Sequence, residues 1–351
     1  MTVRHDSKLG EIGEHRLVEA LQELTTVDWR CPSLRPGDDS SCISTRHSNL
    51  LLKIDGGSIP SNLAPWLSLY DLGWIQAVAA ISDLAAKAAL PLTLQVSIGL
   101  PPSLRLDQAL ALVRGVRDAA LAHGAWLSGG DTNSSREGWV DIAAVGLLVA
   151  EKPVARSPRP GDMVYTTTGR YGLQGLLLHL LYQGRASDAE KLASHSPEAK
   201  RPLARLGFPL LAALAGECIT SSMDVSDGLA FTLHALAAEA HATLQLHRLP
   251  SPSPHLPPRL SREVDVEEAI LYGGQEYEIV FTVKPDCTRI VEENAPRLGL
   301  SIEKIGVIAR GESQVTYKGR RLPGRGWDNF KAFTPTHYTQ HARPQGEEGG
   351  Q

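Results

Sequence analysis

The sequence predicts a two-domain protein whose N-terminal domain has an α+β organisation. Its 351 residues are enough for two hydrophobic cores, and 42% are hydrophobic while 21% are charged, as in an ordinary globular protein. Short apolar runs alternate with longer segments of helical periodicity. A basic, proline-rich stretch at residues 152–161 interrupts this pattern. We therefore expect one domain at residues 1–151 and a second at residues 152–335.

In the first domain, the periodicity of apolar residues predicts three helices and four strands. The last helix follows the break at Pro101-Pro102 and should end near Gly124, a helix stop signal. The expected helices cover residues 11–24, 71–90 and about 104–123, and the expected strands cover residues 50–54, 92–98, 125–128 and 139–149. Acidic residues are expected where strands end or join, at Asp55 and in a loop that contains Asp131.

The second domain should again alternate strands and helices. Strands are predicted at residues 163–168, 219–225 and 279–283, and helices follow Gly175, cover residues 197–216 and cover residues 229–240. A polar tail rich in Gly and Glu, at residues 336–351, is predicted to be disordered.

Composition and charge exclude several classes of function. The net charge of −4 and the absence of a Lys/Arg block give no reason to expect nucleic-acid binding. Residues 71–90 are about long enough to span a bilayer, but Asp83 and Lys87 would then lie inside it, so we interpret this segment as a core helix and expect no membrane association. The polar N-terminus lacks the apolar run of a signal peptide, which predicts a cytoplasmic protein.

The four cysteines are scattered, with neither C-x-x-C spacing nor a histidine at ligand spacing. We therefore expect neither a zinc site nor a disulfide framework, and predict reduced, mostly structural thiols. These residues are Cys31, Cys42, Cys218 and Cys287.

Asp83 is the residue that most needs an explanation, because an ionised carboxylate in an apolar helix is unfavourable without a partner. One alternative is a salt bridge to Lys87, one helical turn further on. However, other acids recur in glycine-flanked or apolar settings, which favours several carboxylates that share divalent cations such as Mg²⁺. These acids are Asp38, Asp39, Asp131, Asp224 and Asp227.

Eight short segments, in this order, resemble the thiamine-monophosphate kinase family, within the superfamily that includes aminoimidazole-ribonucleotide synthetase. They run from about residue 37 to residue 330. The segments are Gly37-Asp38-Asp39, Lys53-Ile54-Asp55, residues 82–88, Gly129-Gly130-Asp131-Thr132, Arg156 ahead of Pro160-Gly161-Asp162, residues 224–229, residues 273–278 and Gly326-Trp327-Asp328.

This resemblance implies an N-terminal α+β domain whose strands form an intersubunit β-barrel in a homodimer, and a C-terminal α/β domain with a mixed sheet, with ATP at the domain junction. It implies that Mg²⁺ is held by Asp39, Asp55, Asp83, Asp131, Asp224 and Asp227. It implies ATP contacts at Gly130, Asp131, Arg156 and Ser226, and substrate contacts at Asn62, Glu276 and Trp327. The chain departs from the family pattern at Lys53-Ile54, where the family has Ser-Thr, at Asn62, where spacing places a family His, and at Gln275-Glu276, where the family has Glu-Asp.

The implied reaction is direct phosphoryl transfer from ATP to thiamine monophosphate, which gives thiamine diphosphate. A phosphate acceptor is already mostly ionised at neutral pH, so no general base is required, and we name no catalytic nucleophile or base. One alternative is an ATP-dependent ligase or cyclase of the same superfamily, which activates an amide or carbonyl oxygen. Another is a catalytically silent dimeric binding protein, against which the six retained Asp residues count.

Overall fold

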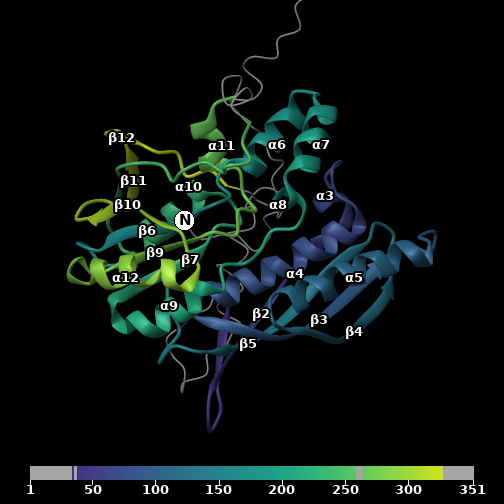
Figure 1. Ribbon diagram of the computed structural model, residues 1–351, viewed down its shortest axis with the longest axis horizontal. Coiled ribbons are helices and arrows are strands. Elements are labelled where there is room, and N and C mark those ends of the chain that lie inside the picture. The colour runs from purple at the N-terminus through teal and green to yellow at the C-terminus, as the bar shows by residue number, and fades with distance from the viewer. Residues whose placement is uncertain (1–33, 35–37, 258–263, 327–351) are drawn as a thin grey trace, which may run out of the picture.

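The computed structural model describes residue 34 and residues 38–257 and 264–326. Its strands form two mixed β-sheets, each with helices packed against it, which confirms the predicted two-domain α+β organisation (Figure 1). The first sheet uses residues 41–148 and the second uses residues 163–321. The expected domain boundary lies in the segment that connects them. The expected helix at residues 11–24 and the expected disordered tail lie outside the described residues.

The first sheet has five strands in the order β1-β2-β5-β3-β4. β3 and β4 are parallel, and the other neighbours are antiparallel. Two long helices, α4 and α5, pack together on one face of this sheet (Figure 1). The elements are β1 (Ser41–Ser44), β2 (Asn49–Ser58), α3 (Ile59–Asn62), α4 (Leu69–Ala86), β3 (Ala89–Leu100), α5 (Leu106–Ala122), β4 (Trp126–Ser134) and β5 (Trp139–Leu148).

Helix α4 is the most buried helix of the first half and carries Asp83. It begins with a capping box, in which Ser68 and Asp71 satisfy each other's backbone N–H groups. The helix ends at Ala86 rather than at the predicted residue 90. The reason is that Ala88 adopts a left-handed backbone conformation, with φ at 65°, and Ala89 already begins β3.

Two acidic segments predicted at strand ends lie within strands instead. β2 does not end at Asp55, because its pairing with β5 continues as far as Ser58. Gly56 permits this pairing, since a Cβ atom there would lie 2.4 Å from the carbonyl oxygen of Val140. Likewise, Asp131 is not in a loop, because β4 continues through it in register with β3.

The second sheet has seven strands in the order β12-β11-β8-β10-β6-β9-β7. β11 and β8 are parallel, and the other neighbours are antiparallel. The strands are β6 (Met163–Thr167), β7 (Ile219–Asp224), β8 (Thr243–Leu246), β9 (Ile279–Val283), β10 (Ile302–Ala309), β11 (Gln314–Tyr317) and β12 (Arg320–Arg321). The helices are α6 (Leu173–Tyr182), α7 (Ala186–His195), α8 (Pro197–Lys200), α9 (Gly207–Ala215), α10 (Leu229–Glu239), α11 (Val266–Tyr272) and α12 (Thr288–Asn294).

The helix predicted at residues 197–216 is divided into α8 and α9. Arg201, directly before Pro202, has an extended φ of −134°, as expected for a residue that a following proline keeps out of the helical region. The connecting segment contacts the first half of the chain. The Trp74 indole donates to the Pro202 carbonyl oxygen at 2.7 Å, and the Ala204 N–H donates to Nε2 of His123 at 2.9 Å.

The prediction of reduced cysteines is wrong for the described part of the chain, where no cysteine is free. Cys218 and Cys287 form a disulfide, and Cys42 is also disulfide-bonded. Cys218 and Cys287 are 69 residues apart, yet the pairing of β7 with β9 brings their Cα atoms to 5.5 Å. The spacing of the cysteines in the sequence therefore did not reveal this pair.

Within the described residues, the helices are all too short or too polar to cross a membrane.

Candidate functional site

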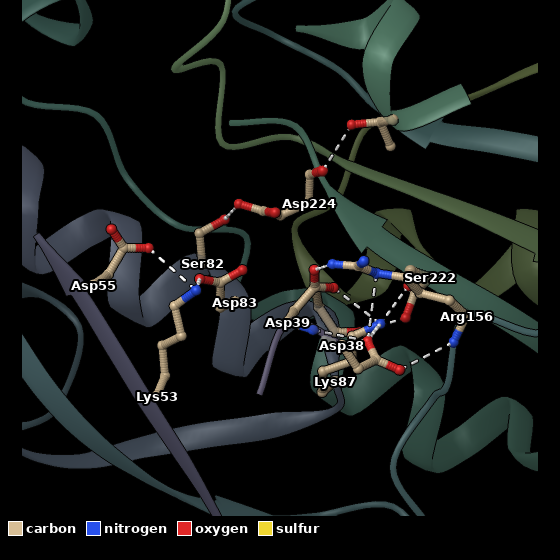
Figure 2. Close-up of polar contacts among 12 residues, drawn as sticks. Asp38, Asp39, Lys53, Asp55, Ser82, Asp83, Lys87, Arg156, Ser222 and Asp224 are labelled. Atoms are coloured by element: carbon tan, nitrogen blue, oxygen red, sulfur yellow. Dashed lines mark hydrogen bonds and ion pairs between the residues drawn. The ribbon is translucent and has the colours of Figure 1, made fainter. Parts of the chain in front are cut away.

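Three buried carboxylates, Asp39, Asp83 and Asp224, meet where the two halves of the chain come together (Figure 2). One oxygen from each lies within 4.8 Å of the others. Asp39 precedes β1, Asp83 is in the last turn of α4, and Asp224 ends β7. Sequence analysis assigned all three to a metal site, and the fold brings them together.

Hydrogen bonds from nearby hydroxyl groups fix Asp224. Ser82 Oγ, on α4, donates to Asp224 Oδ2 at 3.2 Å, and Thr232 Oγ1, on α10, donates to its backbone carbonyl oxygen at 3.0 Å. The Ser82 hydrogen bond thus joins α4, which carries Asp83, to the end of β7, which carries Asp224. It fixes these two carboxylates relative to each other.

Asp83 pairs with Lys53, whereas Lys87 pairs with Asp38 and Asp39, so the intrahelical salt bridge that was one alternative does not form. Lys53 Nζ lies 2.5 Å from Asp83 Oδ2 and 3.3 Å from Asp55 Oδ2 (Figure 2). Lys53 and Asp55 are two apart on β2 and therefore face the same side of the sheet, toward α4.

Lys87 is fully buried and holds the segment before β1. Its ammonium lies 2.8 Å from Asp38 Oδ1 and 2.9 Å from Asp39 Oδ2, and it donates to the Ser222 carbonyl oxygen at 2.5 Å. Arg156 contacts the same two acids, through an ion pair with Asp39 Oδ1 and a 3.4 Å contact to Asp38 Oδ1. Asp38 and Asp39 are thus held between two cations from different segments.

The three clustered carboxylates have different pKa values. Burial raises the pKa of Asp83 well above its usual range and that of Asp224 to about 7, and neighbouring carboxylates raise both further, although Lys53 opposes the rise. Burial would also raise the pKa of Asp39, but the charges of Arg156 and Lys87 outweigh it and lower that pKa to about 2. The crowding of negative charge is therefore concentrated at Asp83 and Asp224.

The donor set fits a hard divalent cation. All the converging ligand atoms are carboxylate oxygens, with the Ser82 hydroxyl beside them, and Mg²⁺ and Ca²⁺ take such oxygen ligands. The Lys53 ammonium already contacts this cluster at Asp83, which shows that the carboxylates attract positive charge.

The other predicted metal ligands are not all in this cluster. Asp55 adjoins it through Lys53, and Asp227 lies in the loop after β7. Asp131 is exposed on edge strand β4, where its Oδ2 accepts from Asn133 Nδ2 at 2.7 Å. Asp131 on β4 lies beside Ser97 on β3, Ser97 lies beside Asp141 on β5, and Asp141 lies beside Gly56 on β2. Three strand spacings therefore separate Asp131 from β2. Asp131 is therefore about 14 Å from Gly56, the residue next to Asp55, in its own chain.

The predicted nucleotide contacts lie at the cluster, in the loop after β7 and on β4. Arg156 is at the cluster, and Ser226 is in the loop after β7, where its carbonyl oxygen accepts from the Gln275 N–H at 2.6 Å. Gly130 adjoins Asp131 on β4, where a Cβ atom would lie 2.0 Å from the Val96 carbonyl oxygen. The backbone of β4 therefore requires glycine at this position.

The predicted substrate residues are engaged in local structure. Asn62 Nδ2 donates to the Ser58 carbonyl oxygen at 2.9 Å. Glu276 is fully buried, and its Oε1 accepts from the Gly172 N–H at 3.0 Å. Burial raises the pKa of Glu276 to about 8, despite the opposing charge of Arg170. Trp327 lies outside the described residues.

Sequence reasoning missed the roles of Ser82 and Lys87 at this site. The signal for Lys87 was available, because a lysine directly after an apolar helix is buried with it and then needs carboxylate partners. No comparable signal marked Ser82, since its partner is 142 residues away in sequence.

Comparison with known proteins defines the class of protein to which this fold and carboxylate cluster belong. Residues 37–148 match the family described as AIR synthase related protein, N-terminal domain. A protein of Thermus thermophilus, tt0281, has a crystal structure that superposes with a TM-score of 0.80 at 32% identity, over 90% of this chain and 100% of that one. AaThiL complexed with AMPPCP and TMP superposes with a TM-score of 0.76, over 93% and 100% of the two chains; at 22% identity this supports the fold alone.

A curated relative then gives the particular family. The thiamine-monophosphate kinase of Pyrobaculum calidifontis is 33% identical over 285 residues, which are 81% of this chain and 88% of that protein. The chain is therefore an enzyme of the thiamine-monophosphate kinase family, as its sequence motifs indicated.

Proposed function

We propose that this enzyme transfers the terminal phosphoryl group of ATP directly to the phosphate of thiamine monophosphate, in a Mg²⁺-dependent reaction. The observation that carries the proposal is the buried Asp39, Asp83 and Asp224 cluster, in a chain that belongs to this kinase family. The name of the Pyrobaculum calidifontis relative supports the acceptor, and the AMPPCP and TMP bound to AaThiL support both substrates.

The carboxylates would hold Mg²⁺ and Arg156 would contact ATP. Asp39, Asp83 and Asp224 form the core of the metal site, to which we add Asp55, Asp131 and Asp227. Bound Mg²⁺ would supply positive charge against the phosphate oxygens of ATP and the acceptor. Arg156 is oriented by its ion pairs with Asp38 and Asp39. Gly130 and Ser226 would complete the nucleotide contacts.

The proposed reaction needs no general base. The side chains that meet at the cluster are carboxylates, two lysines, one arginine and serine hydroxyls, within the part of the chain that the structure describes. A phosphate monoester has a second pKa of about 6, so the acceptor oxygen carries its charge at neutral pH. Positioning and charge neutralisation would therefore provide most of the catalysis.

On the acceptor side, Asn62, Glu276 and Trp327 remain our proposed substrate contacts. Glu276 can face a substrate only if the turn that it stabilises through the Gly172 N–H rearranges, because it is fully buried. Its burial favours a neutral carboxyl group at neutral pH, which could donate a hydrogen bond but would not balance a cationic ring.

We further propose a homodimer formed through the first sheet. Helices α4 and α5 cover one face, whereas Leu50, Leu52 and Ile54 of β2 point to the other, where Ile54 is 74% exposed. Their β5 neighbours on that face are Leu147, Val145 and Ala143, which extend the apolar surface. Apolar surface of this kind is typical of a protein interface.

A dimer would also account for Asp131. Gly130 and Asp131 lie on β4, at the opposite edge of the sheet from β1 and about 14 Å from the strand that carries Asp55. We propose that they complete the site of the partner subunit, so that each active site uses both chains.

The test is to incubate the protein with Mg²⁺, ATP labelled in its terminal phosphate, and thiamine monophosphate. Label in thiamine diphosphate would support the kinase. Label released as inorganic phosphate only when an amide or amine substrate is added would favour the ligase alternative. Absence of any ATP turnover would leave a binding protein.

A further inference from the structure

Lys53 is a positive charge built into the carboxylate site. Its ammonium lies 2.5 Å from Asp83 Oδ2 and 3.3 Å from Asp55 Oδ2, so it bridges a carboxylate of α4 and one of β2 (Figure 2). The Lys53 side chain is only 22% exposed, so these contacts are poorly screened by solvent.

The two other cations of the site serve a different pair of acids. Lys87 and Arg156 both contact Asp38 and Asp39, and their ion pairs do not extend to Asp55 or Asp83 among the described residues. Asp224 accepts a hydroxyl hydrogen bond from Ser82. The side of the site toward β2 therefore depends on Lys53 for its positive charge.

Charge balance limits the number of divalent cations that this arrangement can accept. Five carboxylates, of Asp38, Asp39, Asp55, Asp83 and Asp224, meet the three cations Lys53, Lys87 and Arg156, which leaves a formal charge of −2 before Asp227, whose charge also acts on Asp224. One divalent ion among Asp39, Asp83 and Asp224 neutralises this charge. A second ion between Asp55 and Asp83 would have to displace an ammonium that already contacts both.

We propose that Lys53 takes the place of one divalent cation, so that the nucleotide-free enzyme binds a single ion per chain, at Asp39, Asp83 and Asp224. This inference rests on the proposed metal site. It differs from the proposed function because it concerns the number of ions and not the reaction. Removal of the ammonium should free Asp55 and Asp83 for a second ion.

The experiment uses Mn²⁺ as the probe and counts bound ions on the full chain without nucleotide, from the loss of the free-Mn²⁺ electron paramagnetic resonance signal. Wild type should bind one Mn²⁺ per chain, and Lys53→Met and Lys53→Ser should each bind two. The matched control is Lys152→Met, because Lys152 is 60% exposed and pairs with Glu217 at 2.6 Å on the surface. This control should bind one ion.

Three results would overturn the proposal. They are two or more ions on wild type, an unchanged single ion on both folded Lys53 variants, and no Mn²⁺ on any variant. Absence of Mn²⁺ binding on any variant would also contradict the metal site of the proposed function. The other two results would be compatible with that metal site. Melting curves recorded without metal identify a variant that fails to fold, and the second Lys53 variant then provides the test.

Discussion

Ser82 Oγ donates to Asp224 Oδ2 at 3.2 Å, across 142 residues of sequence. This hydrogen bond joins the helix that carries Asp83 to the strand that ends in Asp224, so the site exists only when the two halves of the chain are folded together.

Replacement of a clustered carboxylate should abolish metal binding while the protein still folds. Asp83→Asn and Asp224→Asn should abolish Mg²⁺-dependent ATP binding, because each removes an oxygen ligand of the cation. The thermal midpoint of Asp224→Asn without metal should stay equal or rise, since this change relieves crowding that raises the pKa of Asp224. Calorimetric titration with ATP and Mg²⁺ measures the binding.

The control for this pair is Asp107→Asn, which changes an exposed aspartate paired with Arg105. It should bind ATP as wild type does. Full ATP affinity in both cluster variants would mean that the carboxylates do not hold the cation.

Lys87→Met should destabilise the protein by about 3–5 kcal/mol, because it leaves Asp38 and Asp39 buried with less compensation. Urea unfolding measures the difference. Lys318→Met is the control, since that lysine is exposed and pairs with Glu267 on the surface, and it should unfold at nearly the same urea concentration as wild type. A loss below about 1 kcal/mol for Lys87→Met would contradict a role for Lys87 in holding the Asp39 segment.

Complementation between subunits tests the contribution of Asp131. Asp83→Asn and Asp131→Asn should each be inactive alone. After the two variant chains are mixed and allowed to exchange subunits, half of the dimers are mixed, and each mixed dimer has one intact site. Recovery of about a quarter of wild-type activity is therefore expected. If the mixture is as inactive as its components, Asp131 does not act across the interface.

Stability should fall in mildly acidic solution through His123. Burial lowers the pKa of His123, whose Nδ1 lies 2.7 Å from the Ala119 carbonyl oxygen while Nε2 accepts from the Ala204 N–H. Because the folded state depresses this pKa, the contribution is complete above the unfolded value of about 6.5 and is lost as pH falls below it. The contribution of His123 to the free energy of unfolding, taken as the difference between wild type and His123→Gln in urea titrations at several pH values, should therefore decline below about pH 6.5.

The curve of His123→Gln should therefore approach that of wild type as pH falls below about 6.5, whereas His47→Gln should follow wild type at every pH, because His47 is exposed. Parallel curves for wild type and His123→Gln would exclude His123 as the titrating group.

Local patterns predicted most of the strands and helices and the three acids of the cluster. What they could not predict depended on contacts between distant segments. Asp83 had a plausible partner in Lys87, one turn away, but β2 passes beside α4 and supplies Lys53 instead. Asp131 looked like a loop residue beside two glycines, yet pairing with β3 extends β4 through it. The Cys218–Cys287 disulfide likewise depends on the pairing of β7 with β9.

Phosphorus NMR of the complete reaction mixture tests the central proposal most directly. The mixture holds Mg²⁺, ATP and thiamine monophosphate, with wild type in one tube and Asp83→Asn in the other. We expect wild type to form thiamine diphosphate in step with ADP, without accumulation of inorganic phosphate, and the variant to form neither product. Inorganic phosphate in step with ADP while thiamine monophosphate stays unchanged, or equal rates for the two proteins, would contradict direct transfer at the Asp39, Asp83 and Asp224 cluster.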